Sequence, residues 1–193
     1  MKLKNRYFLL RHGENNYQVK RKEFAYPAID TLSVKLTEKG IRQIKKAARL
    51  LKKEGIDLIY SSDFFRARQT SKIVAKELNI KKINLDKRLR DTNMGVYHGR
   101  AKKEFYKFLG YKNRKFSTKP PKGESWDDVE KREVGFVKEV DKKYKNKNIL
   151  IVGHGDPLRL LEGAVKGLSH KEFLSQIFTD KDYIKVGELR KIN

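Results

Sequence analysis

Apolar residues occur along the chain in short blocks that alternate with longer amphipathic stretches. Residues 4–10 end in the run YFLL, residues 57–62 read DLIYSS, residues 82–85 read KINL and residues 148–152 read NILIV. Short apolar runs without alternation are typical of strands that are buried on both faces, as in a parallel sheet. The blocks therefore predict four strands, of which residues 148–152 form the clearest.

Between these blocks, apolar positions recur at the spacing of an amphipathic helix. Residues 36–55 show this spacing, with Thr37 as the expected N-cap and Gly55 as the expected stop. Residues 63–79 and 123–144 show the same spacing. A helix is therefore expected after each of the first two strands and again before the last one.

Two further stretches complete the outline. Asp156 and Pro157 follow the last strand and predict a helix start, with Asp156 as the N-cap and Pro157 at the first helical position. Residues 91–123 are rich in glycine, aromatic residues and lysine, and are expected to form a loop.

Strands that alternate with helices predict an α/β fold with three layers, α/β/α, around a mostly parallel central sheet. A length of 193 residues fits a single domain, residues 1–193.

The charge of the chain is strongly positive. It contains 47 Lys and Arg against 24 Asp and Glu, a formal net charge of +23. Such a charge attracts polyanions, including nucleic acids and phosphorylated metabolites. The basic residues are spread over the whole length, however, and mostly fall where helix surfaces face water. The sequence therefore favours solvated lysine-rich surfaces, and the positive charge would allow nucleic acid to bind only non-specifically.

The chain contains no cysteine, which excludes a disulfide framework, a thiolate nucleophile and cysteine-based metal sites. The few apolar residues before Arg11 are too few for the core of a signal peptide, and no later run approaches the length of a membrane span. We therefore expect a cytoplasmic protein that does not interact with a membrane. The oligomeric state is left open.

Three of the expected strands end in polar and charged residues. The first ends in RHGE at residues 11–14, the second in SSDFFRA at residues 61–67, and the last in GHGD at residues 153–156. Ligands of parallel sheets bind beyond the carboxyl ends of the strands. Two histidines and two arginines are therefore expected to meet at one rim, together with the N–H groups of two helix starts. This combination predicts an anion site that contains a nucleophile.

In these motifs the sequence resembles the histidine phosphatase superfamily, which includes the cofactor-dependent phosphoglycerate mutases. The resemblance spans residues 7 to about 160 and implies a phosphoglycerate mutase-like fold. It is carried by six blocks that occur in the order of the family: RHGE, LTEKG followed by Gln43, SSDFFRARQT, LRDTNMG with a later Gly99, GESWDDV, and VGHGDPLR.

The expected roles follow from the chemistry of a phosphomonoester dianion. Arg11 and Arg66 are expected to clamp it, because a planar guanidinium bonds two phosphate oxygens at once. His12 is the expected nucleophile, since nearby cations lower the pKa of an imidazole and keep it neutral. The resemblance implies that His12 forms a phosphohistidine. It also implies that His154, the second family histidine, donates to a phosphate oxygen.

A proton donor for the leaving group is predicted at Asp91. The family places a glutamate four residues before the glycine of its L-x-E-x-x-x-G block, whereas this chain has Asp91 before Gly95. Aspartate is one methylene shorter, and a displacement of about 1 Å can cost on the order of a hundredfold in rate. Asp91 is nevertheless the preferred acid, with Glu14 as the alternative.

Three further residues are predicted to contact the substrate. Gln18 stands where the family usually has an asparagine six residues after the nucleophilic histidine, so its expected role is a supporting one. Asn15 is a nearby polar substitute, and Gly155 lies directly after the second histidine. His98 stands where many relatives carry an acid, which leaves open whether it contacts the substrate or is a solvated loop residue.

Three functions are compatible with these features. The first is a phosphomonoester hydrolase that acts on a small phosphorylated substrate. The second is a cofactor-dependent phosphoglycerate mutase. Mutases of the family that the sequence resembles have a longer basic segment at this place, so the short segment 101–123 favours hydrolysis. Its basic residues keep the mutase as an alternative. The third is a catalytically degenerate protein that binds RNA or another polyanion through its charge. The four histidines lack the short spacing of metal ligands, and no nucleotide-binding glycine motif occurs, so no metal and no cofactor are predicted.

Overall fold

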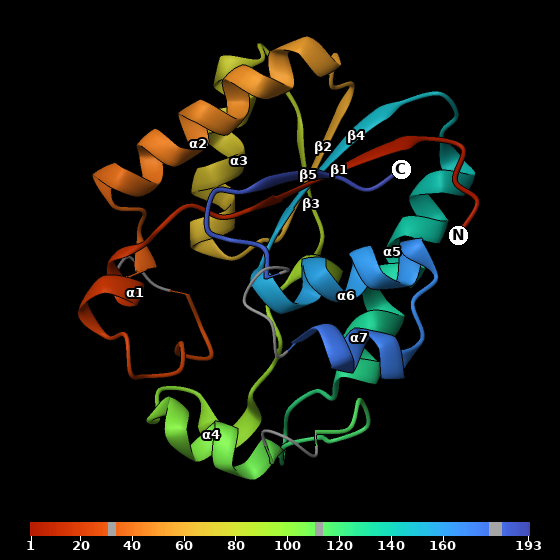
Figure 1. The fold of residues 1–193 in the computed structure, drawn as a ribbon. Helices are drawn as coiled ribbons and strands as arrows, with labels where there is room; N and C mark the ends of the chain where they lie inside the picture. The colour runs from red at the N-terminus through yellow and green to blue at the C-terminus, as the bar shows by residue number, and fades with distance from the viewer. Residues whose placement is uncertain (31–33, 111–113, 178–182) are drawn as a thin grey trace.

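The computed structural model describes residues 1–30, 34–110, 114–177 and 183–193. Its centre is a five-stranded sheet in the order β3-β2-β4-β1-β5, and all neighbouring strands are parallel except β5, which runs antiparallel to β1 (Figure 1). The strands are β1 (Arg6–Arg11), β2 (Leu58–Ser61), β3 (Ile83–Leu85), β4 (Asn148–Gly153) and β5 (Leu189–Lys191). The four strands predicted from the apolar blocks are the four parallel ones. The predicted fold class is thus confirmed.

Helices cover both faces of the sheet. Figure 1 shows α2 and α3 on one side and α5 and α6 on the other. Their bounds are α2 (Glu38–Leu51), α3 (Phe65–Glu77), α5 (Trp126–Lys143) and α6 (Gly155–Lys166). Two short 3₁₀ turns, Lys52–Glu54 and Lys87–Leu89, follow α2 and β3. The helices predicted over residues 36–55, 63–79 and 123–144 are therefore confirmed.

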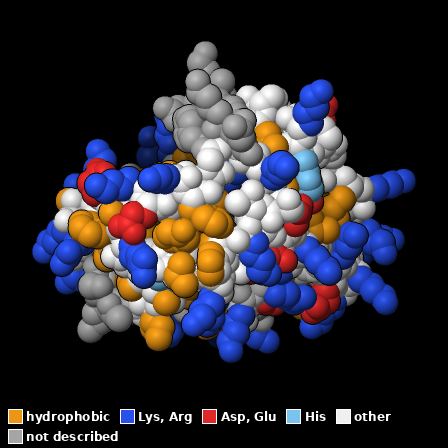
Figure 2. Space-filling view, turned by 90° about the horizontal axis from the view of Figure 1, so that it is seen from below, with side chains coloured by type: hydrophobic (Ala, Val, Ile, Leu, Met, Phe, Trp, Pro, Cys, Tyr) orange, Lys and Arg blue, Asp and Glu red, His pale blue; other side chains and the backbone are white. Residues whose placement is uncertain are grey.

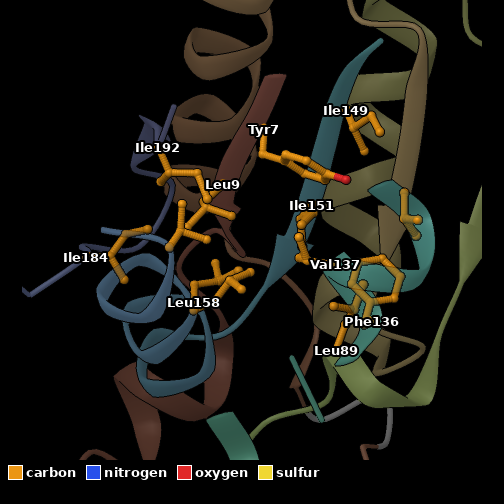
Figure 3. Close-up of a cluster of buried hydrophobic side chains, with 13 residues drawn as sticks. Tyr7, Leu9, Leu89, Phe136, Val137, Ile149, Ile151, Leu158, Ile184 and Ile192 are labelled. Atoms are coloured by element: carbon orange, nitrogen blue, oxygen red, sulfur yellow. The ribbon is translucent and has the colours of Figure 1, made fainter. Parts of the chain in front are cut away.

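The two core clusters follow the alternation of side chains along the strands. Tyr7 and Leu9 of β1 point toward α5 and α6, where Phe136 and Leu158 meet them (Figure 3). The intervening Phe8 points to the other side, toward α2 and α3. Because β1 and β4 are buried on both faces, their ends are held firmly in place. The residues that follow them, His12 and His154, therefore have well-defined positions.

Local capping signals act as predicted in α2. The Thr37 hydroxyl accepts a hydrogen bond from the N–H of Gly40, and Gly55 ends the following turn in a left-handed conformation with φ of 61°. Gly40 also permits a close approach of two backbones: a Cβ at this position would lie 2.0 Å from the carbonyl oxygen of Glu14, and a Cβ at Gly13 would lie 2.7 Å from the carbonyl oxygen of Gly40. The segment after β1 therefore rests directly on the first turn of α2.

Two predictions about local structure are wrong. Helix α6 begins at Gly155 with the extended His154 as its N-cap, so Asp156 lies inside the first turn and is not the cap. Pro157 fits there because the first N–H groups of a helix have no intrahelical partner. Residues 91–123 are not a plain loop, because they contain a 3₁₀ turn, Gly95–Tyr97, and the amphipathic helix α4 (Lys102–Leu109).

Two elements, α1 (Asn16–Lys20) and β5, were not predicted. The short helix α7 (His170–Ile177) lies directly after Leu168 and Ser169, where His170 is compatible with a helix start. Helix α4 lies apart from the sheet, at the same end as α1 and α7 (Figure 1). Among the described residues, no helix is both long and apolar enough to cross a membrane. The cytoplasmic location stays a prediction from the sequence.

Candidate active site

The two histidines of the motifs follow neighbouring strands. Arg11 at the end of β1 is in register with Gly153 at the end of β4, and the N–H of His12 donates to the Gly153 carbonyl at 3.0 Å. His12 and His154 are 1% and 0% exposed, and their ring centroids are 5.3 Å apart with the planes at 60°. The convergence predicted from the strand ends is therefore present.

The hydrogen bond of His12 selects its tautomer. Its Nδ1 lies 2.9 Å from the carbonyl oxygen of Gly13, and because a carbonyl can only accept, Nδ1 carries the proton. The other ring nitrogen, Nε2, is then left with a free lone pair. Burial, followed by the charge of Arg66, the adjacent His154 ring and the charge of Arg11, lowers the pKa of His12 well below its ordinary value. The ring is therefore neutral, which is the state that a nucleophile needs.

Arg66 lies in the first turn of α3 and is fully buried. One of its terminal nitrogens, Nη1, contacts the carboxylate of Asp30, and the other, Nη2, donates to Oδ2 of Asp91 at 2.8 Å. The guanidinium carbon also lies 4.0 Å from the ring centroid of Tyr26. Stacking and two ion pairs fix the plane of the guanidinium, and both carboxylates occupy the positions at which it would bind an oxyanion.

Arg11 approaches the same region from β1. Its Nη1 donates to the carbonyl oxygen of Ile184 at 2.8 Å, and its guanidinium carbon lies 5.0 Å from the ring centroid of Tyr183. Its buried Nε has no hydrogen-bond partner among the described residues. Gly155 leaves the space for this arrangement, because a Cβ there would lie 2.3 Å from the Tyr183 hydroxyl and 3.1 Å from Cζ of Arg11.

Asp91 stands between Arg66 and the second histidine. Its Oδ2 lies 3.7 Å from Nδ1 of His154, and its Oδ1 accepts from the N–H of Thr92 at 3.0 Å. The side chain is 21% exposed, unlike the buried rings beside it. Asp91 is thus the carboxylate that both contacts the cationic and histidine groups and reaches solvent.

A cavity of about 270 Å³ is lined by Arg11 and Asp91 of this group, whereas His12 and His154 are not among its lining residues and Arg66 lines a second, adjoining cavity. Among the lining residues of the first cavity are Arg11, Gln18, Asp91, Gly155, Lys102 and Arg114. Arg114 is largely buried, and its guanidinium carbon lies 3.3 Å from the ring centroid of Trp126. The end of the molecule that carries α4 shows a group of apolar side chains, with Lys and Arg along much of the surrounding surface (Figure 2). The cavity is therefore suited to small anionic molecules.

The other predicted site residues lie as follows. Asn15 is the N-cap of α1 and forms a capping box with Gln18, and its side-chain amide donates to the Tyr26 hydroxyl at 2.8 Å. Asn15 is fully buried, so it supports Tyr26 rather than facing the cavity. The carboxylate of Glu14, the alternative acid, is turned toward the start of α2, where Lys39 and the Thr37 hydroxyl bind it at 2.9 Å each.

His98 lies beside a second cavity, of about 290 Å³, that shares Tyr26 and Asp91 with the first. Its Nε2 accepts from the N–H of Met94 at 3.1 Å, which leaves the proton on Nδ1 for the Tyr26 carbonyl oxygen at 3.0 Å. Both ring nitrogens are therefore bonded to backbone groups, one of its own loop and one of the segment between α1 and α2. Within the described residues, no group of three or more His, Asp or Glu side chains could hold a metal ion.

Three residues of the site were missed. Asp30 and Tyr26 come from the segment between α1 and α2, where no periodic pattern points to them. Ser62 lies within the block SSDFFRARQT, and its Oγ is 2.9 Å from Nε2 of His154. The sequence signal that could have identified Ser62 was its hydroxyl at the end of the predicted strand 57–62, beside the strand ends that carry the two histidines.

The motifs and their placement at one end of a mostly parallel sheet are those of one protein family. The chain belongs to the histidine phosphatase superfamily (branch 1), whose family model matches residues 7–184. The resemblance of the motifs is thereby confirmed.

Its relatives include phosphatases and phosphoglycerate mutases. The chain is 30% identical over 172 residues to phosphoserine phosphatase 1 of Hydrogenobacter thermophilus, covering 86% of this chain and 79% of the relative. It is 35% identical over 153 residues to a 2,3-bisphosphoglycerate-dependent phosphoglycerate mutase of Thermoplasma acidophilum, covering 78% and 71%. A mycobacterial glucosyl-3-phosphoglycerate phosphatase, solved in complex with VO3, superposes with a TM-score of 0.80 at 24% identity, covering 96% and 91%. This last likeness supports the fold.

Proposed function

We propose that this chain is a phosphomonoester hydrolase whose reaction passes through a phosphohistidine on His12. The observation that carries the proposal is the pair of buried, neutral imidazoles, His12 and His154, with the guanidinium groups of Arg11 and Arg66 near both. Two cations can neutralise a phosphoryl dianion, and a neutral imidazole with a free Nε2 can attack it.

In the first step, Nε2 of His12 attacks phosphorus. The N–P bond forms while the bond from phosphorus to the alcohol oxygen breaks, and Asp91, protonated at that moment, gives its proton to the leaving alkoxide. Arg11, Arg66 and His154 bind the phosphoryl oxygens, whose charge is spread in the transition state. Asp30 must release Nη1 of Arg66 for this to happen, so the substrate phosphoryl group replaces a carboxylate.

In the second step, the phosphohistidine is hydrolysed. Asp91, now a carboxylate, takes a proton from a water molecule, and the oxygen of that water bonds to phosphorus. The N–P bond breaks, its electron pair returns to Nε2 of His12, and inorganic phosphate leaves. The partial exposure of Asp91 supports this role, because water can reach the carboxylate. The scheme uses no metal, so we expect EDTA to leave turnover unchanged.

A phosphoglycerate mutase is the second candidate, and one observation favours it. Lys102 and Arg114, both from the basic segment after Asp91, line the same cavity as Arg11. They could hold a second anionic group of a bisphosphate. A panel of phosphoesters that includes 3-phosphoglycerate, with and without its bisphosphate, separates the two functions. Release of inorganic phosphate supports the hydrolase, and isomerisation that depends on the bisphosphate supports the mutase.

The nucleophile is tested by trapping the covalent intermediate. Wild-type protein is mixed with a ³²P-labelled phosphoester and quenched, and we expect an acid-labile, base-stable label that His12→Ala abolishes together with turnover. His170→Ala is the matched control, because this histidine is 47% exposed and stacks on Phe116 at 3.6 Å between ring centroids, away from the cavity. A label that persists in His12→Ala would assign the nucleophile elsewhere.

A further inference from the structure

The second histidine depends on a choice between two tautomers. His154 is fully buried and neutral, because burial, followed by the charges of Arg66 and Arg11, lowers its pKa well below the ordinary value. A neutral imidazole carries one proton. Its Nε2 lies 2.9 Å from Oγ of Ser62, whereas its Nδ1 lies 3.7 Å from Oδ2 of Asp91 and has no hydrogen-bond partner among the described residues. To donate to a phosphoryl oxygen on the Asp91 side, His154 must carry the proton on Nδ1.

The Ser62 hydroxyl has an acceptor only in one of the two tautomers. Ser62 is fully buried, and its Oγ already accepts a hydrogen bond from the N–H of Phe64 at 3.3 Å. Among the contacts of the described residues, Nε2 of His154 is the acceptor within reach of its own proton. If Nε2 carried the proton instead, the Ser62 O–H would remain buried without an acceptor, which is unfavourable.

The neighbouring carboxylate favours the same tautomer. With the proton on Nε2, the lone pair of Nδ1 would face Oδ2 of Asp91, and two acceptors would oppose each other without a proton between them. With the proton on Nδ1, the N–H dipole points toward the carboxylate. Two independent neighbours, Ser62 on one side of the ring and Asp91 on the other, therefore select one state.

The position of Ser62 is fixed by the sheet. Its N–H donates to the carbonyl oxygen of Val152 in β4 at 3.0 Å, and its own carbonyl accepts from the hydroxyl of Ser61 at 2.9 Å. Because β2 and β4 are neighbouring parallel strands, the residue after β2 is held beside the residue after β4. The hydroxyl thus has little freedom to turn away from His154.

We propose that Ser62 is a positioning residue, whose hydroxyl donates to Nε2 of His154 and keeps the imidazole proton on Nδ1, facing the phosphoryl pocket. The catalytic part of this inference rests on the proposed function, because it assumes that His154 donates to a phosphoryl oxygen. The tautomer itself is a property of the resting protein and does not depend on any activity.

The tautomer is measured directly by ¹⁵N NMR of protein labelled at histidine ring nitrogens, with the His154 signals assigned by their loss in His154→Asn. At pH 7.5 we expect wild-type His154 to show a protonated Nδ1 and an unprotonated Nε2. Ser62→Ala should shift His154 toward the Nε2–H form or a mixture, and Ser62→Thr, which retains the hydroxyl, should preserve the wild-type pattern. A wild-type His154 with the proton on Nε2 overturns the proposal without need of any variant.

Kinetics then test the consequence for turnover. We expect Ser62→Ala to lower kcat on the order of 10- to 100-fold, with a smaller change in KM, and Ser62→Thr to recover most of the loss. Ser71→Ala is the matched control, because it removes an equally buried hydroxyl that bonds within α3, to the Arg68 carbonyl. Wild-type kcat in Ser62→Ala, or a retained Nδ1–H tautomer, contradicts the role of Ser62. Labelling that survives in His12→Ala contradicts the proposed function instead.

Discussion

The buried carboxyl of Glu133 leads to a prediction about how the free energy of unfolding depends on pH. Glu133 lies in α5 and is fully buried, its Oε2 has no hydrogen-bond partner among the described residues, and its Oε1 lies 3.4 Å from Nη1 of Arg132. Burial raises the pKa of Glu133 to about 8, against the opposing attraction of Arg132. The folded protein therefore holds a proton on Glu133 over a pH range in which the unfolded chain has released it.

The sign and size of the effect follow from this difference. Because the folded state binds the proton more tightly, the free energy of unfolding falls as the pH rises from the ordinary value of 4.5 toward 8, and above 8 the loss is complete. At about 1.4 kcal/mol per pH unit, the loss is on the order of 5 kcal/mol. Glu133→Gln has no carboxyl to ionise, so this part of the pH dependence disappears.

Urea unfolding followed by circular dichroism checks the prediction at pH 5, 7 and 9. We expect wild type and Glu133→Gln to have similar free energies of unfolding at pH 5, and the variant to be the more stable by several kcal/mol at pH 9. Glu130→Gln, on the same helix but with a 28% exposed side chain, is the control and should show no such divergence. A difference between wild type and Glu133→Gln that is independent of pH would refute the reasoning.

Three further predictions concern the site. Asp91→Asn should slow esters with poor leaving groups far more than activated aryl phosphates, and an equal loss on both would remove Asp91 as the proton donor. Asp30→Asn should strengthen inhibition by inorganic phosphate several-fold, since the anion no longer competes with a carboxylate for Arg66; weaker inhibition would mean that Asp30 instead orients the arginine. Gly155→Ala should lower kcat/KM, because its Cβ displaces the Tyr183 hydroxyl, and adding Tyr183→Phe should restore part of the rate; no recovery in the double variant would place the cause elsewhere.

The parts of the site that lie directly after a strand could be predicted from the sequence. His12 and His154 follow the two central parallel strands, and Arg66 lies in the helix that follows β2. Parallel strands end at one edge of the sheet, so local patterns were enough to bring these residues together. The residues' catalytic roles remain predictions that the experiments above test.

The parts that depend on contacts between distant segments could not be predicted. Asp30 reaches Arg66 from a segment without hydrophobic periodicity, and nothing local indicates that a carboxylate there turns inward. Strand β5 has only three residues, LRK, and forms because the edge of β1 offers it hydrogen-bond partners. The capping box of Asn15 and Gln18 is different: it is a local signal, and it shows that two residues expected to bind substrate also stabilise the start of α1.

The contact between Gly13 and Gly40 links His12, the proposed nucleophile, to helix α2. Two peptide backbones in direct contact have no rotamers with which to absorb a displacement, so we expect a movement of α2 relative to the sheet to displace the segment that carries His12. Ile44, a fully buried residue of α2, lies under the same segment, with its Cγ1 3.0 Å from where a Cβ of Gly13 would be. We therefore expect the rate of the proposed reaction to change with small rearrangements of this helix that leave the melting temperature unchanged.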